Sequence, residues 1–184
     1  MALHRQQGDE VAVMIATDGA AGDPDRYYPE GGYRELRKAE SRSAARILGI
    51  AEPQFWGFPD GALGKADGVV EKVLQALKTI SPDVVYHPSV DEVHPDHYAL
   101  AIAFREALKA CPVSFRHYTY EIWATVRPTH IIDIGAVWDR KKKAMEQYQT
   151  QIRYNDHVHK ISGLNAYRAI YLPSARYVEA FEAG

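Results

Sequence analysis

The sequence has few of the features that mark several protein classes. Its single cysteine, Cys111, excludes an internal disulfide and a zinc site built from several cysteines. The 22 Lys and Arg residues are balanced by 24 Asp and Glu residues, so no basic excess favours nucleic acid or an anionic membrane. The apolar run at residues 11–16 is too short to span a bilayer, and residues 1–8 have no apolar core of signal-peptide length. We therefore expect a cytoplasmic protein without a membrane span.

Short apolar segments alternate with amphipathic segments along the chain, which favours an α/β fold. The run at residues 11–16 is typical of a strand buried on both faces. We predict one three-layer, Rossmann-like domain over residues 1–184, with a mostly parallel sheet. Strands are expected at residues 11–16, 54–58, 83–87, 113–123 and 129–134, and within 168–181. Helices are expected at residues 33–48, 69–79, 94–110 and 138–151.

The segment His94-Pro95-Asp96-His97 carries the most chemical information. Proline suits the first position of a helix, so His94 becomes the cap residue and His97 falls in the first turn. Two histidines three residues apart can face the same space, and a neutral imidazole with a free ring nitrogen there is a metal ligand. Asp96 can orient a ring or offset the helix dipole. The alternative is a proline-started helix with two surface histidines.

Two other groups have simpler explanations. His87 and Asp91 lie just upstream and superficially resemble a second metal motif, but a histidine at the end of a strand and a turn explain them better. The three lysines at residues 141–143 are expected to form a solvated helix face.

A polar pocket is a further possibility. Asp18, Arg37, Tyr27 and Tyr28 could line it, although aromatic residues in a glycine-rich loop are also ordinary turn packing. Arg37 and Glu40 are three residues apart on a predicted helix, where a surface ion pair is the simplest interpretation.

Six segments occur in a characteristic order that spans nearly the whole chain. They are Thr17-Asp-Gly19 after an apolar run, Arg37-x-x-Glu40 followed by Leu48-Gly49, Gly57-Phe-Pro-Asp-Gly61, His94-Pro-Asp-His97, residues 142–151, and Tyr177-Val-Glu-Ala-Phe181. In this combination the sequence resembles the LmbE-like (PIG-L) family of zinc-dependent N-acetylglucosaminyl deacetylases.

The resemblance implies a Rossmann-like fold, a zinc cofactor and a small amino sugar or glycoconjugate as substrate. The reaction it implies is hydrolysis of the substrate's N-acetyl group. It makes His97 a zinc ligand and gives His94 the task of stabilising the oxyanion or moving a proton. We assign catalytic roles to His94 and Asp96, and substrate binding to Arg37 and Asp18.

One element of the family is absent from this sequence. The family opens with a strand and a His-Pro-Asp-Asp-Glu motif, which supplies two zinc ligands and the general base, and no such motif occurs here. We therefore expect the first strand of the sheet to be missing. Catalytic zinc sites use three protein ligands and the matching motif supplies only His97, so we expect weak or no zinc binding.

Three interpretations remain open. The first is an active deacetylase whose N-terminal segment is not included in the sequence. The second is a short chain without catalysis that binds a glycan or a partner. The third is a different metal enzyme with a site built from His87, Asp91, His94 and His97. The sequence leaves the sugar open, and an oligomer is possible.

Overall fold

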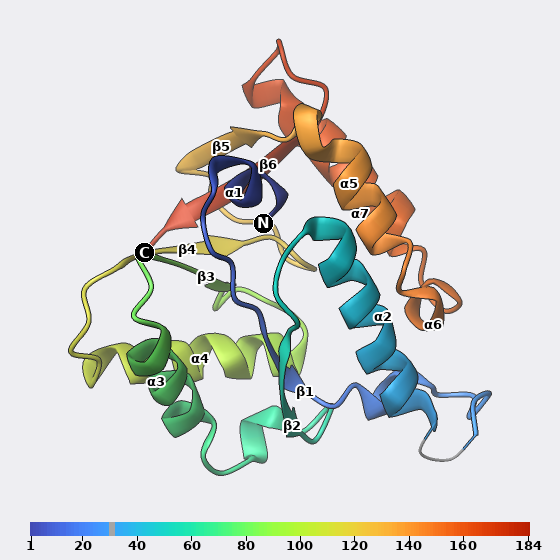
Figure 1. The fold of residues 1–184 in the computed structure, drawn as a ribbon, viewed down its shortest axis with the longest axis vertical. Helices are drawn as coiled ribbons and strands as arrows, with labels where there is room; N and C mark the ends of the chain where they lie inside the picture. Colours follow the sequence, from blue (N-terminus) through green and yellow to red (C-terminus); the bar gives the residue numbers. More distant parts are fainter. Residues whose placement is uncertain (30–31) are drawn as a thin grey trace. The chain divides into compact units, whose positions relative to one another are not determined.

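A computed structural model describes residues 1–29 and 32–184 (Figure 1). The chain divides into two compact units, each made of two chain segments. The first unit contains Met1–Asp60 and Ile132–Glu179, and the second contains Gly61–Ile131 and Ala180–Gly184. The expectation of a single domain over residues 1–184 stays a prediction.

The predicted α/β fold class is confirmed, and the strands of the described part of the chain form two sheets. In the first, β1 (Met14–Thr17) pairs in parallel with β2 (Gln54–Phe58). The second has the order β3-β4-β6-β5 and is mixed, because β3 and β4 are parallel while β4 and β6 are antiparallel. The bounds in this sheet are Val84–Pro88 for β3, Arg116–Tyr120 for β4, His130–Asp133 for β5 and Val178–Ala183 for β6.

Helices alternate with most of the strands, and β4 is followed directly by β5 (Figure 1). Their bounds are Ala2–Gln7 for α1, Gly32–Leu48 for α2, Val69–Ile80 for α3, Pro95–Lys109 for α4, Trp138–Met145 for α5, Gln149–Ile152 for α6 and His157–Arg168 for α7. The helix predicted at residues 138–151 is wrong in its length, because α5 ends at Met145 and a separate short helix follows. The strand predicted within residues 168–181 begins only at Val178. Among the described helices, none has the length and apolar content needed to cross a membrane.

Helix α2 ends where predicted but buries a different face. Gly49 has a φ of 74°, a left-handed conformation that favours glycine and stops the helix. The sequence spacing of Leu36, Ala39, Ser43 and Ile47 predicts that these residues share the inward face, but Leu36 is 41% exposed. The buried residues of α2 are Tyr33, Ser41, Ala44, Ala45 and Leu48.

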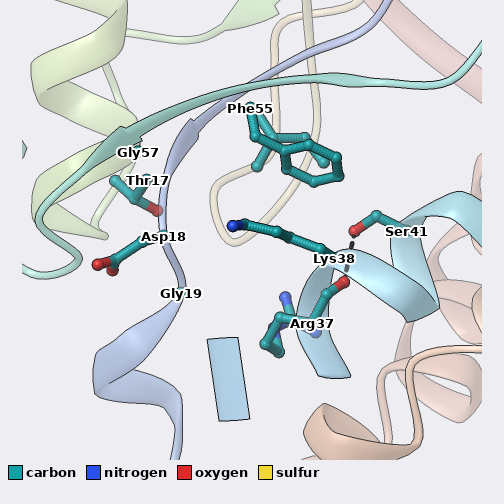
Figure 2. A pocket seen from close by; sticks show the side chains of 9 residues that line it. Thr17, Asp18, Gly19, Arg37, Lys38, Ser41, Phe55 and Gly57 are labelled. Carbon is teal, nitrogen blue, oxygen red and sulfur yellow. Dashed lines mark hydrogen bonds between the residues drawn. The ribbon is translucent and has the colours of Figure 1, made fainter. Parts of the chain in front are cut away.

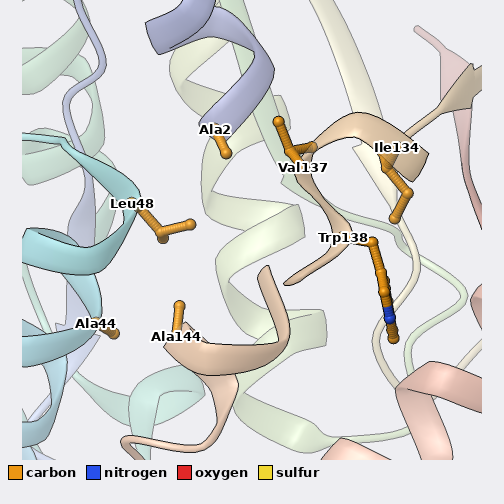
Figure 3. Packing of buried hydrophobic residues seen from close by; sticks show 7 residues of the cluster. All are labelled: Ala2, Ala44, Leu48, Ile134, Val137, Trp138 and Ala144. Atoms are coloured by element: carbon orange, nitrogen blue, oxygen red, sulfur yellow. The ribbon is translucent and has the colours of Figure 1, made fainter. Parts of the chain in front are cut away.

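The apolar core of the first unit joins α1, α2 and α5 (Figure 3). Ala44 and Leu48 of α2 lie in the same cluster as Ile134 and Trp138. The indole ring of Trp138 stacks on Tyr177 with a centroid distance of 3.8 Å and an interplanar angle of 11°. The backbone N–H of Ile134 donates to the carbonyl of Tyr177 at 3.0 Å, so the stack and the chain that carries it are fixed together.

Lys141 departs from the predicted solvated helix face. Its Nζ lies 2.5 Å from Oε1 of Glu179 and 2.7 Å from Oδ1 of Asn165, and its side chain is 22% exposed. Asn165 in turn donates from its side chain to the carbonyl of Val178 at 2.9 Å. Lys141 therefore ties α5 to α7 and to the start of β6.

We predict that Ile134→Ala lowers the free energy of unfolding by about 2–5 kcal/mol, because it opens a cavity in this core. Ile134 is 2% exposed, whereas Ile170 is 68% exposed, so Ile170→Ala is the matched control and should change stability by less than about 0.5 kcal/mol. Urea denaturation of the three proteins measures the difference. Equal stability of the two variants would show that Ile134 does not belong to the core.

Candidate active site

The predicted helix start at His94 is confirmed. His94 has extended backbone angles and is the N-cap of α4, and Pro95 occupies the first turn. The backbone N–H of Asp96 donates to Nδ1 of His94 at 3.2 Å. Because a backbone N–H can only donate, Nδ1 must carry a lone pair, and in the neutral imidazole the proton lies on Nε2. His94 therefore presents an N–H donor on the side of the ring away from its own helix.

Glu92 is the central residue of the site. Its side chain has no exposed surface, and its Oε2 lies 2.9 Å from Nδ1 of His97. Its Oε1 accepts the backbone N–H groups of Trp123 and Ala124, both at 3.0 Å. Burial alone raises the pKa of Glu92, but the hydrogen bonds from His97, Ala124 and Trp123 outweigh it and hold the pKa below its usual value. Glu92 is therefore ionised at neutral pH.

The carboxylate of Glu92 determines the protonation of His97. An ionised carboxylate only accepts, so Nδ1 of His97 carries a proton and donates it. In the neutral imidazole, Nε2 of His97 then holds a lone pair. His94 and His97 thus present opposite groups, an N–H on His94 and a lone pair on His97. Their ring centroids are 4.5 Å apart.

Trp123 completes the cluster of rings. Its ring centroid lies 5.3 Å from that of His94 and 6.4 Å from that of His97, edge-on to both. The side chain keeps 55% of its surface exposed although it contacts two imidazoles. Sequence reasoning missed both Trp123 and Glu92.

The carboxylate of Asp96 accepts backbone N–H groups of the segment after β2 and does not orient an imidazole ring. It is 5% exposed, and its carboxylate accepts the N–H of Gly61 at 2.6 Å and that of Leu63 at 3.0 Å. The Pro59-Asp-Gly61 turn therefore leads directly into a segment fastened to the first turn of α4. The assignment of a catalytic role to Asp96 stays a prediction, and these contacts indicate that any such role is one of positioning.

Asp18 and Arg37, the predicted substrate-binding residues, lie in the first unit, and both line one open pocket (Figure 2). Asp18 Oδ2 pairs with Nε of Arg34 at 3.0 Å, and Oδ1 accepts the N–H groups of Ala20 and Asp60. Gly19 packs tightly here, because a Cβ at this position would lie 3.3 Å from Nε of Arg37. The loop after β1 therefore lies against Arg37.

Arg37 and Glu40 are not the surface ion pair that the spacing suggests. Their side chains are only 18% and 12% exposed, and they are joined at 3.2 Å. Glu40 also accepts the N–H of Thr150 at 2.8 Å and the Thr150 hydroxyl at 2.6 Å. The Arg37-x-x-Glu40 segment thus fixes the first turn of α6 to α2.

The third interpretation, a metal site built from His87, Asp91, His94 and His97, is wrong. Among residues 1–29 and 32–184, no three or more His, Cys, Asp or Glu side chains are grouped so that they could hold a metal ion. His87 is used differently. Its Nδ1 lies 2.9 Å from the carbonyl of Pro88, and its Nε2 lies 3.2 Å from Nδ1 of His117.

The contacts of His87 also fix its proton. Nδ1 donates to the carbonyl of Pro88, so Nε2 accepts from His117. The ring stacks on Phe104 with centroids 4.0 Å apart. The pKa of His87 is lowered to about 4, chiefly by burial; the hydrogen bond to Pro88 opposes this shift and the nearby His117 adds to it. His87 is therefore a neutral, half-buried side chain engaged by Pro88 and His117, and not a ligand.

The model of the PIG-L family, described as GlcNAc-PI de-N-acetylase, matches residues 1–108, which include Asp18, Arg37, His94 and His97. The chain belongs to the PIG-L family. The match covers the strand-loop-helix segment of the first unit and all but the last residue of α4.

Relatives and solved structures agree with the family and its α/β fold. A 4-oxalmesaconate hydratase of Pseudomonas putida is 26% identical over 97% of this PIG-L chain and 78% of its own length. A probable N-acetyl-alpha-D-glucosaminyl L-malate deacetylase of Bacillus anthracis is 28% identical over 63% of this chain and 56% of its own length. The structure of the conserved protein TT1542 of Thermus thermophilus has a TM-score of 0.82 and 27% identity, and covers 99% of this chain and 84% of its own.

We predict that Glu92→Gln reverses the tautomer of His97 in this PIG-L chain. A glutamine amide can keep its oxygen on the N–H groups of Trp123 and Ala124, which turns its NH₂ group toward Nδ1 of His97 and makes Nδ1 the acceptor. Two-bond ¹H–¹⁵N correlation spectra at neutral pH distinguish the protonated from the unprotonated ring nitrogen. Asp91→Asn removes a neighbouring carboxylate and is the control. An unchanged tautomer in Glu92→Gln would contradict the assignment.

We also predict a loss of stability in mild acid that depends on His87. The pKa of His87 is about 4 in the folded chain and about 6.5 in the unfolded chain, so the unfolded state binds more protons between these values. The free energy of unfolding should therefore fall as the pH drops from 6.5 toward 4. His87→Gln keeps an acceptor for His117 without a titrating ring and should show a shallower fall. A titration midpoint of His87 near 6.5 in NMR spectra would disprove this.

Proposed function

We propose that this chain acts in the hydrolytic removal of the N-acetyl group from an N-acetylglucosamine-type sugar or sugar conjugate. The observation that carries the proposal is the opposite protonation of His94 and His97, fixed by Asp96 N–H and by Glu92. Family membership supports it, and so does the similarity to a deacetylase of Bacillus anthracis.

An amide hydrolase needs a donor for the oxyanion and an acceptor for a proton. Nε2–H of His94 supplies the donor, aimed away from the helix that holds the other ring nitrogen. Nε2 of His97 supplies the lone pair, and Glu92 stabilises the imidazolium that forms when this nitrogen takes a proton. Nε2 of His97 takes a proton from the water that attacks the acetyl carbonyl, and Nε2–H of His94 donates to the oxyanion of the tetrahedral intermediate. When the C–N bond breaks, the His97 imidazolium gives that proton to the leaving amine, and acetate is released.

Zinc enters the proposal through the family, and Nε2 of His97 is the atom that would bind it. The described residues do not complete such a site, because catalytic zinc uses three protein ligands and these residues contain no group of three. The steps above therefore use the chain's own side chains. We propose that Asp18 and Arg37, which line the pocket of the first unit, contact sugar hydroxyls.

Addition of water to a double bond is a second candidate, favoured by the similarity to a hydratase over 97% of the chain. A hydratase also needs one proton donor and one acceptor, which His94 and His97 provide. The two functions differ in substrate, since 4-oxalmesaconate is an anionic carboxylate and an N-acetyl sugar is neutral.

The test is release of acetate from a panel of N-acetylglucosamine conjugates, measured with and without added zinc, beside hydration of 4-oxalmesaconate. We expect acetate release, and a fall in kcat of about 10²–10³-fold in His94→Ala with a smaller change in KM, because this change removes one oxyanion donor. His159→Ala, which alters an exposed histidine of α7, is the matched control. Hydration without acetate release would replace the proposed function by the second candidate.

A further inference from the structure

Trp123 is an exposed aromatic side chain held rigidly beside the two histidines. Ligand sites are lined by aromatic side chains beside a few convergent polar groups, and Trp123 stands in that relation to His94 and His97. Trp123 is 55% exposed while its ring touches both His94 and His97. A molecule that reaches either imidazole from solvent therefore meets the indole as well.

The backbone that carries the indole is fixed by the residue that orients His97. One oxygen of Glu92 accepts the N–H groups of Trp123 and Ala124, while the other accepts Nδ1–H of His97. One buried carboxylate therefore fixes both the backbone that carries the indole and the ring nitrogen of His97. Preorganisation of this kind lowers the entropy lost when a ligand binds.

The charge of the surrounding segments selects the kind of ligand. Residues 88–98 and 117–126 contain four carboxylic acids, and arginines flank the second segment at positions 116 and 127. The ionised carboxylate of Glu92 contacts His97 directly, so an anionic carboxylate ligand at the imidazoles would meet a like charge. A neutral sugar avoids that repulsion, and the C–H face of its ring packs well on a flat, electron-rich indole.

We propose that Trp123 is the platform on which the ring of a neutral pyranose stacks next to His94 and His97. This rests on the proposed function and specifies its substrate class. It makes Trp123 a specificity-determining residue that favours an uncharged sugar over a carboxylate.

The experiment measures binding and not turnover. Dissociation constants for N-acetylglucosamine and for mesaconate, a dicarboxylate probe, are obtained by NMR titration of the wild-type chain, Trp123→Ala and Trp123→Phe. Tyr167→Ala is the control, because Tyr167 is an aromatic residue with 65% exposure in the other compact unit. We expect Trp123→Ala to weaken sugar binding about tenfold or more, Trp123→Phe to weaken it by less, and Tyr167→Ala to leave it unchanged.

Fluorescence gives a second readout that does not need the alanine variant to fold. Sugar should change the tryptophan emission of the wild-type chain, and this change should vanish in Trp123→Phe, where Trp56 and Trp138 remain. Any one of three results would overturn the proposal. These are a fluorescence change that persists in Trp123→Phe, tighter binding of mesaconate than of the sugar, and no sugar binding by the wild-type chain. Sugar binding that depends on Trp123 without acetate release would instead contradict the proposed function alone.

Discussion

The ionised carboxylate of Glu92 is the interaction on which the candidate site depends. A buried charge is expensive unless hydrogen bonds replace its water, and Glu92 receives three of them, two from backbone N–H groups and one from His97. Both backbone N–H groups donate to Oε1, so Oε2 is left to accept the proton on Nδ1 of His97. The proton on Nδ1 of His97 and the place of Trp123 both follow from these hydrogen bonds.

The difference between the two histidines has a local cause. His94 caps α4, so a backbone N–H reaches its Nδ1 and leaves the proton on Nε2. His97 is the third residue of the helix, within the same first turn, and its Nδ1 instead reaches Glu92. Residues of the same type therefore become a donor and an acceptor through their positions relative to one helix end. The pairing needs no shift in the chemistry of the imidazole itself.

Features of this site that depend on neighbouring residues could be predicted from the sequence. Contacts between residues far apart in the chain could not. The cap at His94 depends on Pro95 next to it, and the end of α2 depends on Gly49, so both are visible in the sequence. The partners of Glu92 at Trp123 and Ala124 lie 31 and 32 residues away, at the end of the strand predicted at residues 113–123, which in the structure ends at Tyr120. The predicted buried face of α2 was wrong because a polar residue, Ser41, is buried there. Its hydroxyl donates to the carbonyl of Arg37, so its burial leaves no hydrogen-bonding group unsatisfied.

In the first unit, Glu40 plays the part that Glu92 plays in the second: its carboxylate accepts several hydrogen bonds from distant segments. Glu40 accepts a backbone N–H and a hydroxyl from Thr150 and an N–H from Arg37. Its carboxylate thereby joins residues 110 positions apart and positions Arg37 against the glycine at position 19. In both units an acidic side chain that charge counting would place on the surface is instead a largely or fully covered acceptor. The near balance of acidic and basic residues therefore conceals carboxylates that organise structure, and their partners are backbone N–H groups that no count of charges can reveal.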